Sequence, residues 1–114
     1  MKRYTIFVEG GYFHSLADIE AHTEAFAVRL ALTYAEESAR LYAARCWTAE
    51  RWAEGPLGLA VVVAPINADG DVTTPGTTHY AKFDPAQYGD DERKLLTPLN
   101  IPGVFPIPLT IKDC

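Results

Sequence analysis

The chain has 114 residues, a formal net charge of −5 and two cysteines. This length predicts a single domain, residues 1–114, that buries about two-thirds of the surface exposed by the unfolded chain. The ten lysines and arginines are scattered along the chain, which argues against direct binding of nucleic acid through its phosphates. No apolar run approaches the roughly 18 residues of a membrane span, and no signal peptide pattern is present. We therefore expect a cytoplasmic protein without membrane contact.

A short strand over Tyr4–Val8 is the first predicted element, because large apolar side chains alternate there and two glycines follow. Gly10 and Gly11 permit a sharp turn or a bulge, and we expect Tyr12–Phe13 to continue the strand past it. Both faces of this strand are expected to be at least partly covered, because apolar residues occur on each.

An amphipathic helix over Ser15–Tyr34 is the main predicted element. Ser15 can cap its N-terminus, and Asp18 occupies the position of the reciprocal carboxylate in a capping box. Helical spacing places four residues on one face, namely Ile19, Phe26, Leu30 and Thr33. Such a stripe needs a surface to pack against, so the helix is predicted to cover one face of a sheet.

The stretch after this helix supports two interpretations. A continuous helix from Asp18 to Trp52 would be about 52 Å long, which is too long for a compact domain of this size, so we expect a break near Glu36–Ser38. Arg40–Thr48 is then either a strand that returns beside the first one, which its alternating pattern favours, or a second helix that forms a hairpin with the first.

The most apolar run in the chain is Gly58–Ile66, which is short and rich in valine and therefore predicts a central strand. Pro65 is expected to mark its end, because proline has no amide hydrogen to donate to a neighbouring strand. Asn67–Asp71 has the composition of a turn. Val72–Thr78 is either a hairpin return or a loop, and His79–Phe83 is a short predicted strand.

Beyond Asp84–Pro85 the chain is irregular and rich in proline. Asp90 or Asp91 is expected to cap a short helix that ends at Leu96. In Leu99–Cys114 the density of proline excludes a helix and a central strand, although the residues between the prolines are apolar. We therefore predict an extended C-terminal arm that crosses the body of the domain or lies along a sheet edge.

Together these elements predict an α+β fold of two layers. One principal amphipathic helix packs on a mixed or mostly antiparallel sheet of three to five strands, and the proline-rich arm follows. Cys46 and Cys114 are predicted to be free thiols, because a disulfide framework in so small a domain would use more cysteines.

The sequence contains no motif of a common enzyme class: no P-loop, no Gly-x-Ser-x-Gly, no His-Glu-x-x-His and no Cys-x-x-Cys. We therefore predict no catalytic residues, no cofactor and no metal ligands. The acidic balance favours a protein partner with a basic surface. The predicted function is that of a small non-enzymatic protein-binding module, such as an inhibitor, adaptor or assembly component that acts on a complex that handles nucleic acid.

Six residues are predicted to contact the partner: Trp47, Arg51, Trp52, Val104, Phe105 and Ile107. The first three combine large apolar area with charge, which is typical of binding hot spots. The last three lie in the C-terminal arm. Where they are not buried within one molecule, they are the best candidates for a contact with another chain, including a second copy of this one.

The run Thr5–Leu16 places an acidic residue and then two glycines at the end of the first strand. In this it resembles the opening of NYN and PIN-type nuclease domains. The resemblance implies a metal-dependent nuclease in which Glu9 takes the place of the metal-binding aspartate, while Asp69 or Asp71, after the apolar strand, supplies a second ligand. This nuclease is the alternative to the binding function.

Overall fold

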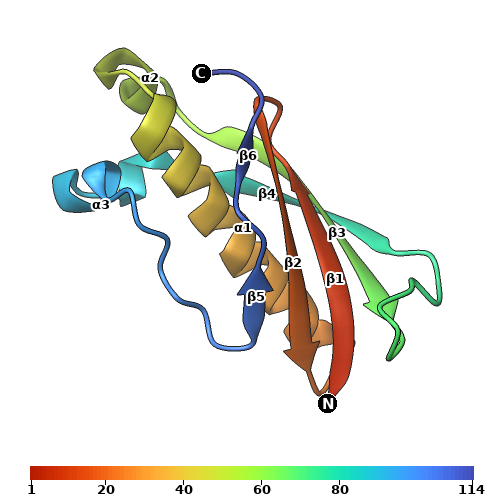
Figure 1. Cartoon of the computed structure of the whole chain (residues 1–114). Helices are drawn as coiled ribbons and strands as arrows, with labels where there is room; N and C mark the ends of the chain where they lie inside the picture. The colour runs from red at the N-terminus through yellow and green to blue at the C-terminus, as the bar shows by residue number, and fades with distance from the viewer.

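One long helix lies diagonally across one face of an antiparallel sheet in the computed structural model, which describes all 114 residues (Figure 1). The strands are β1 (Lys2–Glu9), β2 (Phe13–Ala21), β3 (Leu57–Ile66), β4 (Thr77–Phe83), β5 (Val104–Pro106) and β6 (Thr110–Ile111). The helices are α1 (Glu24–Cys46), α2 (Ala49–Glu54), the 3-10 helix η1 (Pro85–Gln87) and α3 (Asp90–Lys94). The order in the sheet is β4-β3-β1-β2-β5, and β6 also pairs with β2. The predicted α+β fold is confirmed, although the sheet has six strands rather than three to five.

β1 and β2 form a hairpin that turns at Gly10 and Gly11. The Gly10 amide donates to the Phe13 carbonyl at 3.1 Å, and Gly11 has a φ of 87°, a conformation that favours glycine. A side chain on Gly10 would collide with the Phe13 ring. The strand predicted over Tyr4–Val8 is confirmed as part of β1. The prediction that Tyr12–Phe13 continues it is wrong, because the chain reverses at the glycines.

The principal helix begins later than predicted, because Phe13–Ala21 is the strand β2. Every second side chain of β2 is buried, and the strand pairs with β1 along its whole length. Ser15, the predicted helix cap, is one of these buried strand residues. The Thr23 hydroxyl caps α1 instead, by accepting from the Phe26 amide at 3.2 Å. The period of two over β2 prevails over the helical spacing because a tight turn brings this segment directly beside β1.

α1 runs without a break over Glu24–Cys46. The predicted break at Glu36–Ser38 is therefore wrong, and Arg40–Thr48 is neither a strand nor a separate second helix, because α1 continues through most of it. The break was predicted because a helix over Asp18–Trp52 would be too long, but the actual helix is shorter at both ends, since β2 extends to Ala21 and α1 ends at Cys46. The 23 helical residues span about 35 Å, which fits within the 44 Å length of the molecule.

A row of alanines allows α1 to lie close to the sheet. Its five members are spaced four residues apart and fully buried: Ala27, Ala31, Ala35, Ala39 and Ala43. Residues at this spacing share one helical face, and their small side chains bring the helix near the strands. The core residues of the sheet fill the remaining space, among them Ile6, Val8, Ile19, Val61 and Val63. Phe26, which was predicted on the buried face, is 47% exposed.

β3 confirms the strand predicted over Gly58–Ile66 and has neighbours on both sides, β1 and β4. The turn predicted at Asn67–Asp71 is also present, and the Asn67 side chain accepts from two backbone amides within it, at 2.9 and 3.0 Å. β4 contains the predicted strand His79–Phe83 and begins at Thr77.

The C-terminal part of the chain lies along α1 and the edge of β2. α3 is the short helix that was predicted there, but it follows Gly89 and ends at Lys94. The predicted arm Leu99–Cys114 is not one continuous extended segment. It contains β5 and β6, which both pair with β2, and between them the Ile107 amide donates to the Leu16 carbonyl at 2.9 Å.

Cys46 and Cys114 form a disulfide, so the prediction of free thiols is wrong. Their Cα atoms lie 4.9 Å apart. The unbroken α1 carries Cys46 to its C-terminal end, and β6 brings the last residues of the chain back toward that end (Figure 1). Because 68 residues separate the two cysteines in sequence, no local pattern indicates that they meet.

We expect loss of this disulfide to lower the free energy of unfolding by about 4 kcal/mol, because a cross-link over a loop of this length restricts the unfolded chain. The measurement is urea unfolding, followed by circular dichroism, of the wild type with and without reductant and of Cys114→Ser. Reductant should destabilise the wild type about as much as Cys114→Ser does, and it should leave Cys114→Ser unchanged. Equal unfolding midpoints for all samples would contradict a stabilising role of the bond.

Candidate functional site

The predicted contact residues Trp47, Arg51 and Trp52 lie together where α1 passes into α2. The two indole rings meet edge to face at 5.2 Å, and both lie against Phe83 at the end of β4. The Arg51 guanidinium lies 4.0 Å from the centre of the Trp47 ring. All three side chains are partly buried, so much of their apolar area is used in contacts within the domain.

Tyr88 and Arg93 also belong to this group. We call Trp47, Trp52, Phe83 and Tyr88, with Arg51 and Arg93, the aromatic cluster. Tyr88 stacks on Phe83 with 4.9 Å between the ring centres, and the Arg93 guanidinium lies 5.0 Å from the Trp52 ring. Burial raises the pKa of Tyr88, and nearby carboxylates, first among them Glu36, raise it further. The cluster therefore closes one end of the core with neutral aromatic groups.

The other three predicted contact residues are divided between the two faces of the sheet. Val104 is buried in the core opposite Ile19, whereas Phe105 is 56% exposed and lies on the face away from α1. Ile107 is 53% exposed beside Leu16. Val104 thus packs within the domain, while Phe105 and Ile107 are accessible from outside.

Phe105 and Ile107 belong to an apolar strip on the uncovered face of the sheet, since α1 covers the opposite face (Figure 1). Phe7 and Leu16, each 37% exposed, stand opposite one another in the β1–β2 ladder and extend the strip toward the middle of the sheet. We call Phe7, Leu16, Phe105 and Ile107 the open-face patch. Single exposed apolar residues are common, but a contiguous group on neighbouring strands is typical of a surface that contacts other molecules.

Glu9 lies at the opposite end of the sheet from Asp69 and Asp71. In the β1–β3 ladder Glu9 is opposite Ala60, so the rest of β3, as far as Ile66, separates it from the turn with the two aspartates by about 20 Å. The convergence implied by the nuclease resemblance is therefore wrong, because it depends on parallel strands and every pairing here is antiparallel. Nowhere do three His, Cys, Asp or Glu side chains lie together as a metal ion would require.

Glu9 forms an ion pair with Lys112 instead. Both carboxylate oxygens accept from Lys112 Nζ at 2.9 Å, and one of them also accepts from the Gly11 amide at 3.0 Å. The hydrogen bond from Lys112 is the main cause that lowers the pKa of Glu9. This pair fastens the end of the chain beyond β6 to the turn between β1 and β2.

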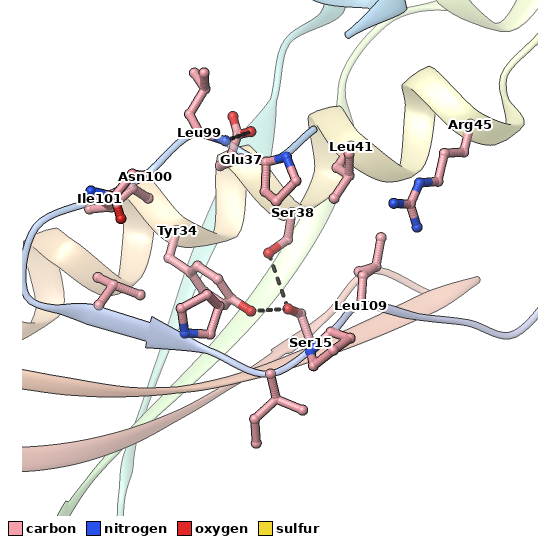
Figure 2. A pocket seen from close by; sticks show the side chains of 15 residues that line it. Ser15, Tyr34, Glu37, Ser38, Leu41, Arg45, Leu99, Asn100, Ile101 and Leu109 are labelled. Carbon is pink, nitrogen blue, oxygen red and sulfur yellow. Dashed lines mark hydrogen bonds between the residues drawn. The ribbon is translucent and has the colours of Figure 1, made fainter. Parts of the chain in front are cut away.

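A cavity of about 390 Å³ lies between α1 and the C-terminal segment (Figure 2). Its outer wall is apolar and built largely from Pro98, Leu99, Ile101, Pro106, Pro108 and Leu109. Its inner wall comes from α1 and β2 and includes Ser15, Tyr34, Ser38, Leu41 and Arg45. No sequence motif marks this site. The only available signal was a proline-rich segment too apolar to remain in solvent.

Three buried hydroxyl groups form the floor of the cavity. The Ser38 hydroxyl donates to Ser15 Oγ at 3.2 Å, and Ser15 is hydrogen-bonded to the Tyr34 hydroxyl (Figure 2). Tyr34 in turn donates to the Leu16 carbonyl at 3.0 Å. The floor is neutral, because hydroxyl groups carry no charge. No buried side-chain oxygen is left without a partner, and these hydrogen bonds tie α1 to β2.

Arg40 and Glu37 hold the chain segment that leads into the outer wall. Arg40 is 1% exposed, and its guanidinium donates to both carboxylate oxygens of Glu37 at 2.6 and 3.0 Å. It also donates to the backbone carbonyls of Glu92, Leu95 and Thr97. Glu37 accepts from the Leu99 amide at 3.0 Å. The hydrogen bond with Glu37 raises the pKa of Arg40, so the buried guanidinium stays charged.

No known protein family, curated protein or solved structure is significantly similar to this chain. None of its helices is both long and apolar enough to span a membrane. The proposal for a function therefore rests on the open-face patch, the aromatic cluster and the cavity.

We expect Arg40→Met to lower the free energy of unfolding by about 3–5 kcal/mol, because it leaves a largely buried carboxylate and three carbonyl groups without their donor. Urea unfolding monitored by tryptophan fluorescence measures this loss. Arg29→Met, on the exposed side of the same helix, is the matched control and should change the stability by less than about 0.5 kcal/mol. A loss below about 1 kcal/mol for Arg40→Met would show that the segment is held by other contacts.

We expect Lys112→Met to raise the pKa of Glu9 toward its usual range. A carboxyl group with a lowered pKa in the folded state stabilises the fold above its unfolded pKa, and this contribution disappears as the pH falls through the folded value. The wild type should therefore be more stable than Lys112→Met at neutral pH, by less than about 1 kcal/mol because the pair is partly exposed, and the difference should disappear as the pH falls through the lowered pKa of Glu9. Carbon-detected NMR titration of Glu9 is the measurement, with Lys94→Met as control. A pKa unchanged by Lys112→Met would contradict the assigned cause.

Proposed function

We propose that this chain is a non-enzymatic protein-binding module that docks through the open-face patch. The observation that carries the proposal is the exposure of Phe7, Leu16 and Phe105, on neighbouring strands of one uncovered sheet face, together with Ile107 directly after β5. β1 and β2, which carry Phe7 and Leu16, are paired on both sides, and β5 is paired with β2, so the patch has a rigid support and little conformational freedom is lost when a partner binds. Burying a large apolar side chain contributes roughly 1.5–3 kcal/mol, and a few such anchors commonly dominate an interface.

Charge next to the patch supports a partner with a basic surface. Asp18 stands opposite Phe105 and forms an ion pair with Arg3 at 3.4 Å, while the exposed Glu20 on the same strand has no ion-pair partner. The chain as a whole carries a net charge of −5. A protein that handles nucleic acid has such a basic surface, and the chain would act on it as an inhibitor, adaptor or assembly component.

A second contact with the partner through Trp47, Arg51 and Trp52 stays a prediction. It would use only the exposed part of the aromatic cluster. The Cys46–Cys114 bond argues against the expected cytoplasmic location, because structural disulfides persist in oxidising compartments and are rare in the cytosol.

We expect Phe105→Ser and Ile107→Ser each to weaken the complex at least about tenfold, because truncating an apolar anchor in an interface removes about 1.4 kcal/mol or more. Affinity purification with the tagged chain identifies the partner, and titration calorimetry with the purified components then gives the dissociation constant. Phe26→Ser is the matched control, since Phe26 is exposed to a similar extent on α1 and should leave the affinity unchanged.

A dissociation constant that is unaltered in both patch variants would contradict docking through the open face. Analytical ultracentrifugation over a range of concentrations tests whether the partner is a second copy of the chain. A dimer that Phe105→Ser dissociates would identify self-association as the use of the patch.

A further inference from the structure

The cavity beside α1 is a second surface with different chemistry from the open-face patch, with which it shares only Ile107. Its volume of about 390 Å³ lies within the range of about 300–1,000 Å³ that small-molecule sites occupy. Its walls are mainly apolar, and most of its polar side chains are fixed in place by hydrogen bonds, namely Ser15, Tyr34, Glu37 and Ser38. These are the usual features of a site for a small organic ligand.

Arg45 is the one charged group of the lining that has no charged partner. Glu37, the other one, is bound to Arg40 and to the Leu99 amide. Arg45 forms no ion pair, and Figure 2 shows its side chain extending from α1 toward Leu109. A guanidinium at the margin of an apolar cavity attracts an anion, because the low polarity of the walls strengthens the interaction.

The hydroxyl groups on the floor do not compete for that anion. The protons of Ser38 and Tyr34 are donated to Ser15 and to the Leu16 carbonyl, and Ser15 is bonded to Tyr34. The floor is therefore neutral and already satisfied. It suits the uncharged body of a ligand, whereas the Arg45 end suits a charged group.

We infer that this cavity binds a small amphipathic carboxylic acid in its anionic form. The Arg45 guanidinium pairs with the carboxylate through two parallel hydrogen bonds, as arginine and carboxylate geometry permits. The aliphatic body lies between Leu41 and the proline-rich wall. One uncompensated positive charge matches a single negative charge, whereas a phosphate monoester carries nearly two at neutral pH.

The cavity is held open without a ligand. Arg40 fixes the chain at Glu92, Leu95 and Thr97, the pairing of β5 with β2 fixes the middle of the wall, and the disulfide fixes its end. A preformed site loses little conformational entropy on binding, so even a small ligand can bind measurably.

The test is an NMR titration of the oxidised full chain with sodium octanoate, with octanol as the uncharged probe of the same chain length. We expect saturable shifts of the amides of Ser38, Leu41, Arg45 and Leu109, and binding of octanol that is at least about tenfold weaker. Arg45→Gln should weaken octanoate binding about tenfold or more, and Arg45→Lys should weaken it less, because it keeps the charge but loses the paired hydrogen bonds. Arg29→Gln removes the same charge from the same helix and should bind as the wild type does.

Arg45 is exposed and makes no ion pair, so the amide spectrum of Arg45→Gln should show an intact fold. Absence of saturable binding to the wild type overturns the inference. So does equal affinity of the wild type and Arg45→Gln for octanoate, or a set of shifts confined to the open-face patch. Because Arg45 lies outside that patch, Arg45→Gln should leave the complex with a protein partner unchanged, which separates this site from the proposed docking surface.

Discussion

The close contact between α1 and the sheet through five alanines is the constraint on which the rest of the structure depends. Alanine at every fourth position leaves no bulky side chain along that row, so the large residues of β1, β2 and β3 can fill the core against it. The same contact leaves the opposite sheet face without cover. The domain has one helix layer, which covers one face of the sheet. The open-face patch therefore stays exposed on the other face.

The C-terminal segment depends on α1 in turn, because its prolines cannot form a continuous hydrogen-bonded strand. Its backbone groups are satisfied from outside: by β2 at β5 and β6, and by Arg40 where the chain leaves α3. A segment attached at separate points does not pack uniformly against the helix. The gap between these attachments is the cavity, with Arg45 at one end and Tyr34 and Ile101 at the other (Figure 2).

The predictable parts of the fold were those with a local cause. The valines of Gly58–Ile66 and the alternation in Tyr4–Val8 indicated strands, and both were found. The principal helix was placed too early because Phe13–Ala21 contains apolar residues that fit either period, whereas the row of alanines was a visible signal of the true buried face. The site residues depend on contacts across the chain, such as Arg40 with Thr97 or Ser15 with Ser38, and no pattern within a short window could indicate them.

The bond between Cys46 and Cys114 also closes the chain from the end of α1 to the last residue into a covalent ring. Every strand after α1, the aromatic cluster and the outer wall of the cavity belong to that ring. A protease that cuts once in the exposed loop before β4 would therefore separate no fragment, since both pieces remain attached through the end of the helix. After such a cut, the disulfide would still hold the open-face patch and the cavity in one molecule.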